Sequence, residues 1–309
     1  MKIVFMGTPK FGAIILEKLI EGGYKPDLVI TETDKEKGRK QILTSSSVKV
    51  TAQNFNIPIF QPEKNEDLKS KIESMKPDLA IVAAYGRILS KEVLDIPKYK
   101  SLNIHPSILP KYRGASPIQH TILNDDKESG VTIILMDEKI DHGKIISRIN
   151  CQIPEKITYR QLSLLMAELG GKIIVDTIPK WINNEIEPEI QKEVEASYTK
   201  TLKKEDGKID WNLPATQIEK KIRAFDPWPG TWTSWNNIRL KILKTRVFKF
   251  PVKEKYLIGQ ILIVPQNEAA VQCKEDFLVL EELQLEGKKP LKSEEFLRGH
   301  QDFMNAVLK

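Results

Sequence analysis

Short apolar runs separated by segments with helical spacing organise the first half of this chain. The runs at 2–6, 28–31 and 79–83 are nearly continuous and are typical of strands buried on both faces of a parallel sheet. Between them, apolar positions are spaced for helices at 13–20, 48–55 and 67–75. This alternation predicts an α/β domain with a mostly parallel sheet and right-handed crossovers.

The pattern changes in the second half. Residues 131–136 and 145–149 predict two more strands, and 159–182 predicts a long amphipathic helix interrupted at Pro179. Residues 183–206 are polar with little periodicity, as in a linker. The next apolar segments are short and alternating, and together they predict a small β-barrel: 239–249, 257–264, 269–273 and 277–285. We therefore expect two domains, at 1–185 and 205–309, joined by a linker at 186–204.

Composition narrows the class of protein. The chain has 309 residues, of which 40% are hydrophobic and 29% charged, as in an ordinary globular protein of two domains. No apolar run is long enough for a signal or a membrane anchor. Cys151 and Cys273 lie far apart without CxxC spacing, which disfavours a disulfide scaffold or a zinc site. We expect a cytoplasmic protein without a metal.

One segment carries candidate chemistry. Asn103 and His105 are two residues apart, so they point the same way on an extended chain, which Pro106 then ends. Together with Asp141 they form a set suited to acyl transfer, because an amide and a cationic imidazole donate to an oxyanion and a carboxylate orients the imidazole. On spacing alone, the alternative is stronger: a single histidine after a strand is usually only a satisfied polar residue.

The glycines near the N-terminus point away from nucleotide chemistry. Gly7 and Gly12 form a GxxxxG turn, which lacks the GxGxxG of a dinucleotide site. No Lys-Ser/Thr follows, so the turn is no P-loop either. A dehydrogenase and a nucleoside triphosphatase are both disfavoured.

Positive charge gathers in one stretch of the second half. The net charge is +6, and 239–255 holds seven basic residues against the single acid Glu254. Loose alternation with apolar residues predicts a strand with one basic face. Such a face usually only keeps a strand edge from pairing with another strand, and this feature alone favours that interpretation. The same face would also suit contact with backbone phosphates. The candidates are Arg239, Lys241, Lys244 and Arg246.

Taken together, several segments resemble the methionyl-tRNA formyltransferase family. They run in one order over almost the whole chain: MGTPKFG at 6–12, AAYGRIL at 83–89, SLNIHPSILPKYRGASPI at 101–118, GVTI at 130–133, Asp141-His142-Gly143, KEDGKIDW at 204–211, IRAFDPWPGT at 222–231, and LEGKKP and FLRGH near the end. The resemblance implies a Rossmann-like formyltransferase domain and a C-terminal OB-like β-barrel domain. It also implies transfer of the formyl group of 10-formyltetrahydrofolate to methionyl initiator tRNA, without a metal. We expect a monomer.

The resemblance also assigns roles to residues. Asn103, His105 and Asp141 would be the catalytic residues, with Asp141 either charging His105 or passing a proton through water. The folate would be held by Ser107, Ile108, Leu109 and Pro110 and by the backbone of Tyr85, Gly86, Arg87, Ile88 and Leu89. A charged loop with Lys37, Arg39 and Lys40 would reach the tRNA acceptor end, with Arg39 at the family's key arginine. At Glu36, Ser45 and Ser47 this loop departs from the family's proline-rich form.

Two other functions compete with this reading. A formyltransferase acting on a sugar-nucleotide amine shares the Asn, His and Asp residues, but the basic segments at 35–40 and 239–255 favour tRNA. A non-catalytic RNA-binding protein is disfavoured by the complete set of three residues.

Overall fold

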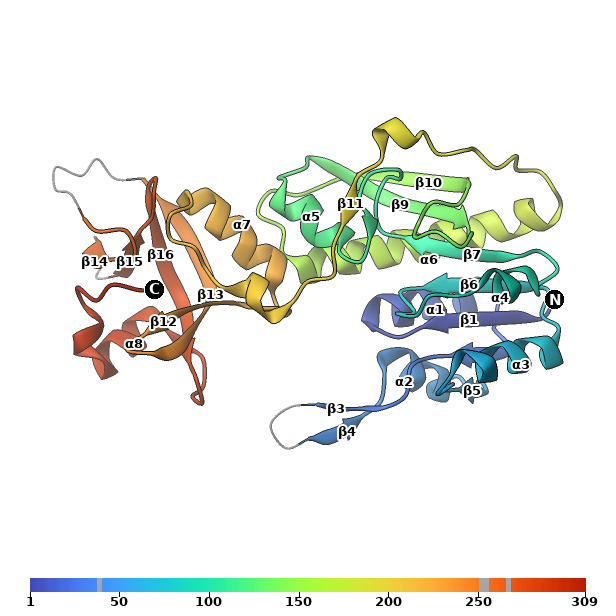
Figure 1. The fold of residues 1–309 in the computed structure, drawn as a ribbon, viewed down its shortest axis with the longest axis horizontal. Coiled ribbons are helices and arrows are strands. Elements are labelled where there is room, and N and C mark those ends of the chain that lie inside the picture. Colours follow the sequence, from blue (N-terminus) through green and yellow to red (C-terminus); the bar gives the residue numbers. More distant parts are fainter. Residues whose placement is uncertain (38–40, 250–255, 265–267) are drawn as a thin grey trace. The chain divides into compact units, whose positions relative to one another are not determined.

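The structure is a computed structural model that describes residues 1–37, 41–249, 256–264 and 268–309. The chain forms two compact units, each with its own sheet (Figure 1). The first unit comprises 1–117, 128–153 and 162–200. The second comprises 118–127, 154–161 and 201–309. The domain limits expected from the sequence stay a prediction.

A mostly parallel sheet forms the centre of the first unit, in the order β10-β9-β7-β6-β1-β2-β5. Its strands are β1 (Ile3–Gly7), β2 (Leu28–Ile30), β5 (Ile59–Phe60), β6 (Leu79–Ala83), β7 (Ser101–His105), β9 (Glu128–Leu135) and β10 (Ile145–Gln152). All neighbours from β5 to β7 pair in parallel, whereas β9 pairs antiparallel with both β7 and β10. The strands predicted from the apolar runs are therefore confirmed.

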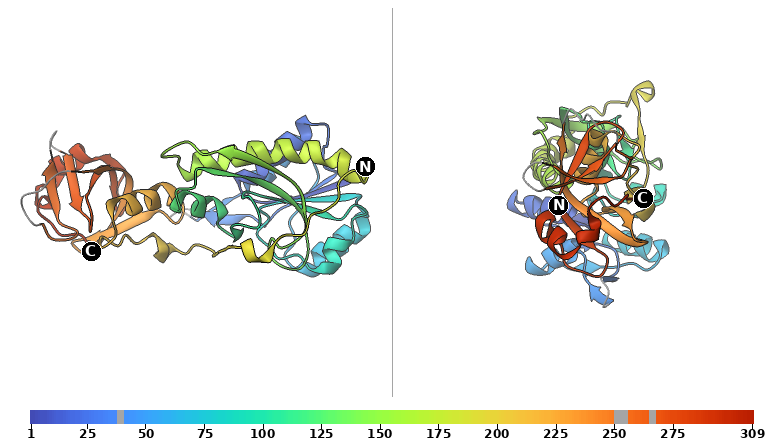
Figure 2. Two further views of the ribbon diagram at one scale, coloured as in Figure 1. Left: turned by 90° about the horizontal axis from the view of Figure 1, so that it is seen from above. Right: turned by 90° about the vertical axis from the view of Figure 1, so that its left-hand side faces the viewer.

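Helices cover both faces of this sheet (Figure 2). Their bounds are α1 (Lys10–Glu21), α2 (Ser47–Asn54), α3 (Asn65–Met75), α4 (Lys91–Asp95) and α6 (Tyr159–Ile182). Val4 and Met6 of β1 pack in one core with α3 and α4. On the other face α6 runs close to α1 and β7, and a Cβ on Gly170 would stand 2.8 Å from Cγ2 of Ile104. Helix α6 continues through Pro179, which the sequence predicted as an interruption.

The GxxxxG turn has a packing role. A Cβ on Gly7 or Gly12 would lie 2.8 or 2.7 Å from the carbonyl oxygen of Ala83, at the end of β6. The turn therefore packs directly on the backbone that leads into residues 84–89. Thr8 Oγ1 also donates to the carbonyl oxygen of Tyr85 at 2.9 Å. The glycines thus fix the loop after β6.

Two small sheets complete the first unit. Strands β3 (Lys35–Lys37) and β4 (Ile42–Thr44) form an antiparallel hairpin where the sequence predicted only a charged loop. Strands β8 (Arg113–Gly114) and β11 (Tyr198–Thr199) pair in parallel, with the 3₁₀ helix η1 (Glu193–Glu195) just before β11. Part of the segment expected to be a linker is therefore hydrogen-bonded to the first unit.

The second unit is built on an antiparallel sheet in the order β12-β13-β16-β15-β14, with β17 beside β16. The strands are β12 (Thr231–Trp235), β13 (Ile238–Phe248), β14 (Ile261–Val264), β15 (Glu268–Gln272), β16 (Phe277–Leu285) and β17 (Leu291–Lys292). The helices are α7 (Ala215–Phe225), α8 (Ser293–Gly299) and the 3₁₀ helices η2 (Lys204–Gly207) and η3 (Gln301–Phe303). Helix α5 (Pro117–Leu123) belongs to this unit from Ile118 onward.

The core of the second unit is aromatic and aliphatic. Trp235 contacts Phe296 and Phe303 edge to face, with ring centroids 5.8 and 5.1 Å apart. Between β12 and β13, Asn236 and Asn237 both have positive φ, which matches the turn that a two-residue hairpin needs. The predicted fold class, a mostly parallel α/β domain with a small β domain after it, is confirmed. Among the described residues, no helix is long and apolar enough to cross a membrane.

Candidate active site

The alternation of side chains along β7 creates the site. Ile104 is buried at 1% exposure against α6, so Asn103 and His105 point to the opposite face of the sheet. In the sheet Asn103 pairs with Ile134 and His105 with Thr132, both on the antiparallel strand β9. His105 is itself 4% exposed. The sequence pattern placed these two side chains correctly relative to each other.

Asp141 reaches this pair from a turn after β9. Its Oδ1 accepts from Nδ2 of Asn103 at 3.2 Å and lies 3.4 Å from Nδ1 of His105, and its Oδ2 accepts from the backbone N–H of Gly114 at 2.8 Å. Asp141 has a φ of +50°, a left-handed conformation that is uncommon outside glycine and is frequent at functional sites. The structure therefore brings the three candidate catalytic residues together, and "the trio" below means Asn103, His105 and Asp141.

The electrostatics of the trio favour an ion pair. Burial alone would lower the pKa of His105, but the charge and hydrogen bond of Asp141 and the carbonyl of Tyr112 outweigh burial and raise that pKa above its ordinary value. Burial likewise opposes ionisation of Asp141, yet His105, the Gly114 N–H and the Arg113 charge together lower its pKa. Both shifts stabilise an imidazolium beside a carboxylate.

The two ring nitrogens of His105 agree with that charge state. Nε2 lies 2.9 Å from the carbonyl oxygen of Tyr112, which only accepts, so Nε2 carries a proton. Nδ1 faces the carboxylate of Asp141, which also accepts. A doubly protonated ring satisfies both neighbours. The second amide hydrogen of Asn103 has no partner among the described residues and is available to a substrate oxygen.

The segment after β7 is held rigidly. Ser107 Oγ donates to the carbonyl oxygen of Lys111 at 2.6 Å, and Thr132 Oγ1 bridges the carbonyl oxygen of Ser107 and the backbone N–H of Leu109. Ser107 and Leu109 are fully buried, whereas Ile108 and Pro110 are half-buried. The accessible part of this predicted folate segment is therefore Ile108 and Pro110.

The other predicted folate segment follows β6. Tyr85 is buried in the core, where desolvation raises the pKa of its hydroxyl, and Leu89 is buried as well. Gly86 is exposed with a φ of +90°, and Ile88 is 73% exposed. Arg87 donates to the carbonyl oxygen of Pro62 at 2.8 Å. Gly86 and Ile88 thus remain open to a ligand, while Tyr85 and Leu89 anchor the loop.

A buried arginine and a glutamine support the trio. Arg113 is completely buried, and its Nη1 donates to both carboxylate oxygens of Glu193 at 3.0 Å and to the Tyr198 hydroxyl at 2.8 Å. Gln191, 7% exposed, links Arg113 to the turn of Asp141. Gln191 carried no signal in the sequence, because it is one glutamine in a polar segment 50 residues from Asp141.

The residues predicted to bind tRNA fall in two places. Lys37 ends β3, while Arg39 and Lys40 lie outside the described residues. In the second unit the guanidinium of Arg239 stacks on the Trp232 ring, with its Cζ 4.1 Å from the ring centroid. Lys241 is exposed and pairs with Trp232 in the β12–β13 register. Lys244 pairs with Glu281 at 2.9 Å, and Arg246 pairs with Glu268 and, at 3.8 Å, with Glu281.

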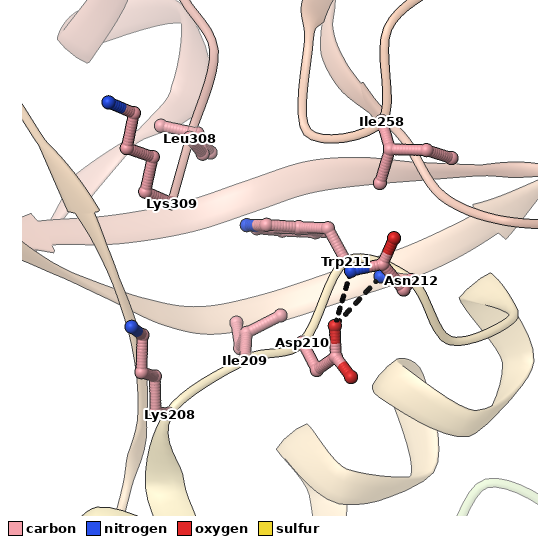
Figure 3. Close-up of a pocket in the computed structure, with 8 residues that line it drawn as sticks. All are labelled: Lys208, Ile209, Asp210, Trp211, Asn212, Ile258, Leu308 and Lys309. Carbon is pink, nitrogen blue, oxygen red and sulfur yellow. Dashed lines mark hydrogen bonds between the residues drawn. The ribbon is translucent and has the colours of Figure 1, made fainter.

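The second unit also contains a cavity of about 430 Å³ (Figure 3). Trp211, Ile258 and Leu308 supply apolar walls, and Lys208 and Lys309 are also among the residues that line it. The Oδ1 of Asp210 accepts from the backbone and side-chain nitrogens of Asn212, both at 3.0 Å. Within the described ranges, no group of three or more His, Cys, Asp or Glu side chains is arranged to hold a metal ion.

Comparison with known proteins identifies relatives over the whole chain. The family model described as formyl transferase matches residues 1–178, and the model described as formyl transferase, C-terminal domain, matches residues 201–301. The methionyl-tRNA formyltransferase of Clostridium novyi is 39% identical over 312 residues and covers 100% of both chains. That of Bacillus subtilis is 39% identical over 302 residues, covering 96% of this chain and 94% of the relative.

Solved structures share the fold at low sequence identity. A variant of HypX from Aquifex aeolicus superposes with a TM-score of 0.68 and 16% identity over 98% of this chain, which spans only 49% of that protein. The N-formyltransferase from Helicobacter canadensis, in complex with folinic acid and dTDP-3-aminofucose, has a TM-score of 0.65 and 24% identity over 91% of this chain and 98% of its own. At these identities the likeness concerns the fold.

Proposed function

The chain belongs to the methionyl-tRNA formyltransferase family, and we propose that it transfers the formyl group of 10-formyltetrahydrofolate to the α-amine of methionyl initiator tRNA. The observation that carries the proposal is the arrangement of the trio. Asp141 Oδ1 contacts Asn103 Nδ2 and faces Nδ1 of His105, so one carboxylate orients an amide donor and charges an imidazole. This combination suits the stabilisation of a negatively charged oxygen.

The reaction exchanges one carbon–nitrogen bond for another. The neutral α-amine attacks the formyl carbon, forming a tetrahedral intermediate whose oxygen is negative. The bond from that carbon to N10 of the folate then breaks, the amine loses one proton and N10 gains one. Asn103 donates its second amide hydrogen to the developing oxyanion, a contact worth roughly 3 kcal/mol in comparable sites.

His105 acts mainly through its charge in this arrangement. Its Nε2 donates to the Tyr112 carbonyl and its Nδ1 faces Asp141, so the imidazolium is held in place while its positive field favours the oxyanion. The raised pKa of His105 and the lowered pKa of Asp141 support the assignment of Asp141 to charging the histidine rather than to carrying the proton.

The accessible residues around the trio suit a folate. Ile88 offers an exposed apolar side chain, Gly86 an exposed backbone, and Ile108 and Pro110 the rim after β7. Buried neighbours fix both loops, so these groups are preorganised. We assign the folate contact to Gly86, Arg87, Ile88, Ile108 and Pro110, with Tyr85, Leu89, Ser107 and Leu109 supporting them.

For the tRNA we propose two contact regions: the basic segment 35–40 with Lys37, Arg39 and Lys40, and the outer face of β13 with Arg239, Lys241, Lys244 and Arg246. Basic side chains there would neutralise backbone phosphates and make binding depend on salt. We further propose that the protein acts in the cytoplasm as a monomer, which analytical ultracentrifugation of the protein with and without tRNA would test.

A parallel assay tests the substrate. Transfer of labelled formyl from 10-formyltetrahydrofolate is measured to methionyl initiator tRNA, to methionyl elongator tRNA and to an aminosugar nucleotide. We expect rapid transfer to the initiator tRNA. Transfer to the aminosugar nucleotide alone would replace the proposal by its nearest rival, and binding of tRNA without transfer to any of the three amines would indicate a non-catalytic protein.

A further inference from the structure

The turn that carries Asp141 is held by a side chain from a distant part of the chain. Gln191 lies between α6 and η1, in the segment that returns along the first unit to β11. Its Nε2 donates to the backbone carbonyl oxygens of Asp141 at 2.8 Å and of Gly143 at 2.7 Å. Both hydrogens of one amide are therefore spent on the backbone on either side of His142.

The third polar group of that amide is also engaged. Oε1 of Gln191 accepts from Nε of Arg113 at 3.1 Å. Arg113 belongs to β8, and the next residue along, Gly114, donates its backbone N–H to the Asp141 carboxylate. Gln191 thus connects the two backbone segments that meet at Asp141, one through its nitrogen and the other through its oxygen.

The turn needs such a support. Asp141 has a φ of +50°, which costs free energy for a residue with a Cβ and persists only where its surroundings enforce it. Gly143 lies against the end of β9, where a Cβ would stand 1.8 Å from the carbonyl oxygen of Leu135. Gln191 holds the backbone between these two positions, and the carboxylate that projects from it must reach both Asn103 and His105.

We propose that Gln191 is a positioning residue for formyl transfer, which sets the turn from Asp141 to Gly143 so that one carboxylate serves Asn103 and His105 together. The inference rests on the proposed function, because it concerns the same site. The one hydrogen bond that Gln191 makes with a described atom of the trio is the bond to the backbone carbonyl oxygen of Asp141. Its effect on the reaction therefore passes through Asp141.

The proposal predicts a change in His105 as well as in rate. His105 and Asp141 act on each other, the charge of Arg113 also acts on Asp141, and Arg113 is in turn paired with Glu193 on η1. If Asp141 moves away, its carboxylate raises the pKa of His105 less, while burial lowers that pKa as before. The imidazolium then loses its proton at a lower pH. A side chain that only stabilised the fold would leave this titration where it is.

The test replaces Gln191 by Met, which keeps the length of the side chain and removes the amide. Titration of the His105 ring is followed by nitrogen NMR without substrates, and kcat and the KM for 10-formyltetrahydrofolate are measured with the amine that the wild-type protein uses. We expect kcat to fall at least about tenfold, the folate KM to change less than about twofold, and the His105 titration to move down by about one pH unit.

A matched control lies in the second unit. Gln272, far from the trio in sequence, donates its Nε2 to the carbonyl oxygen of Cys273 at 2.6 Å, and Gln272→Met removes this bond from a glutamine amide to a backbone carbonyl. We expect this variant to keep both kcat and the His105 titration. If Gln191→Met fails to fold, Gln191→Glu keeps the size and the acceptor for Arg113 but lacks the paired donors, and we expect it too to lose kcat at constant folate KM.

A wild-type kcat together with a wild-type His105 titration in a folded Gln191→Met or Gln191→Glu protein would overturn the proposal, even if the melting temperature fell. Failure of the proposed function has a different signature: the wild-type protein would transfer formyl to none of the tested amines, or only to the aminosugar nucleotide. The NMR titration needs no substrate, so it judges Gln191 in either case.

Discussion

The two regions assigned to the reaction, the trio and the basic face of β13, differ in how far their charged side chains are exposed to water. In the first unit His105 and Asp141 have side-chain exposures of 5% and 13%, and hydrogen bonds from Gly114 and Asn103 and to Tyr112 satisfy their polar atoms. On β13 of the second unit the Lys244 side chain is 71% exposed, and the side chain of its partner Glu281 is 26% exposed. Water screens the second region and hardly reaches the first. We therefore expect changes in the trio to act on kcat, and changes on β13 to act on tRNA affinity and its salt dependence.

The largest effect is expected from Asp141→Asn, which keeps the shape of the side chain and removes its charge. The variant leaves His105 buried without an anionic partner, which disfavours the imidazolium and the oxyanion it stabilises. Single-turnover transfer with methionyl initiator tRNA should slow by roughly a hundredfold or more.

The control for Asp141→Asn is folate binding, followed by fluorescence titration with tetrahydrofolate. Its affinity should stay within about twofold, because the accessible residues assigned to the folate are on other loops. Turnover near that of the wild type would show that the buried ion pair contributes little to the rate, and the contrast between the two regions would fail.

The pH dependence of His105 sharpens the same contrast. Because the folded-state pKa of His105 lies above its ordinary 6.5, the ion pair stabilises the fold below that ordinary value and loses its contribution as pH rises through the raised pKa. Asp141, with a lowered pKa, loses its contribution as pH falls through that value. In Asp141→Asn, NMR should find the His105 titration at least about one pH unit lower than in the wild type. An unchanged titration would mean that another group charges the histidine.

Arg39→Ala should have an intermediate effect on tRNA alone. An arginine bound to a phosphate contributes about 1.5 kcal/mol or more, so kcat/KM for methionyl initiator tRNA should fall roughly tenfold. The measurement is transfer at low tRNA concentration. Lys35→Ala is the matched control in the same basic segment, because Lys35 already pairs with Glu32 at 2.6 Å and should matter less. Equal loss of folate binding in Arg39→Ala would point to misfolding instead.

Local pattern was enough to predict the framework of the site. Apolar runs located β1, β2 and β6, and the spacing of Asn103 and His105 placed both side chains on one face of β7, because alternation is a property of any strand. The strand pairing that brings Asp141 back to β7 was less accessible, since it depends on the antiparallel return of β9. The chemistry of the residue types suggested Asp141 as the third member of the set, but the assignment of catalytic roles to all three came from the resemblance to a family.

Support from distant polar segments could not be predicted. Residues 186–204 lack apolar periodicity and were expected to be a linker, yet Gln191 and Glu193 reach Arg113, and Thr199 pairs with Gly114. Single hydrogen bonds between segments far apart in sequence leave no periodic pattern. The hairpin of β3 and β4 was missed for a related reason: its strands are three residues each, and Ile42 and Leu43 are both exposed rather than alternating.

The smallest effects, and the finest division, are expected within the basic face of β13. Arg239 is held by the Trp232 ring and Lys241 is exposed beside it, whereas Lys244 and Arg246 are paired with Glu281 and Glu268. A basic side chain that is not already paired with a carboxylate neutralises a phosphate more fully on binding, and so displaces more counterions from the nucleic acid. The double variant Arg239→Ala/Lys241→Ala should therefore make the negative slope of log affinity against log salt shallower by about two units, and weaken binding several-fold. Filter binding of initiator tRNA over a range of salt concentrations measures both.

The matched variant is Lys244→Ala/Arg246→Ala, which removes the same number of positive charges from the same strand. Because Glu281 and Glu268 already neutralise these side chains, the salt slope should become shallower by less than about one unit. The kcat for formyl transfer at saturating tRNA should stay unchanged in both double variants. Equal slopes for the two pairs would show that the carboxylates do not compete with phosphate. No change in either would remove β13 from the tRNA contact and leave the basic segment 35–40 as the region that binds the nucleic acid.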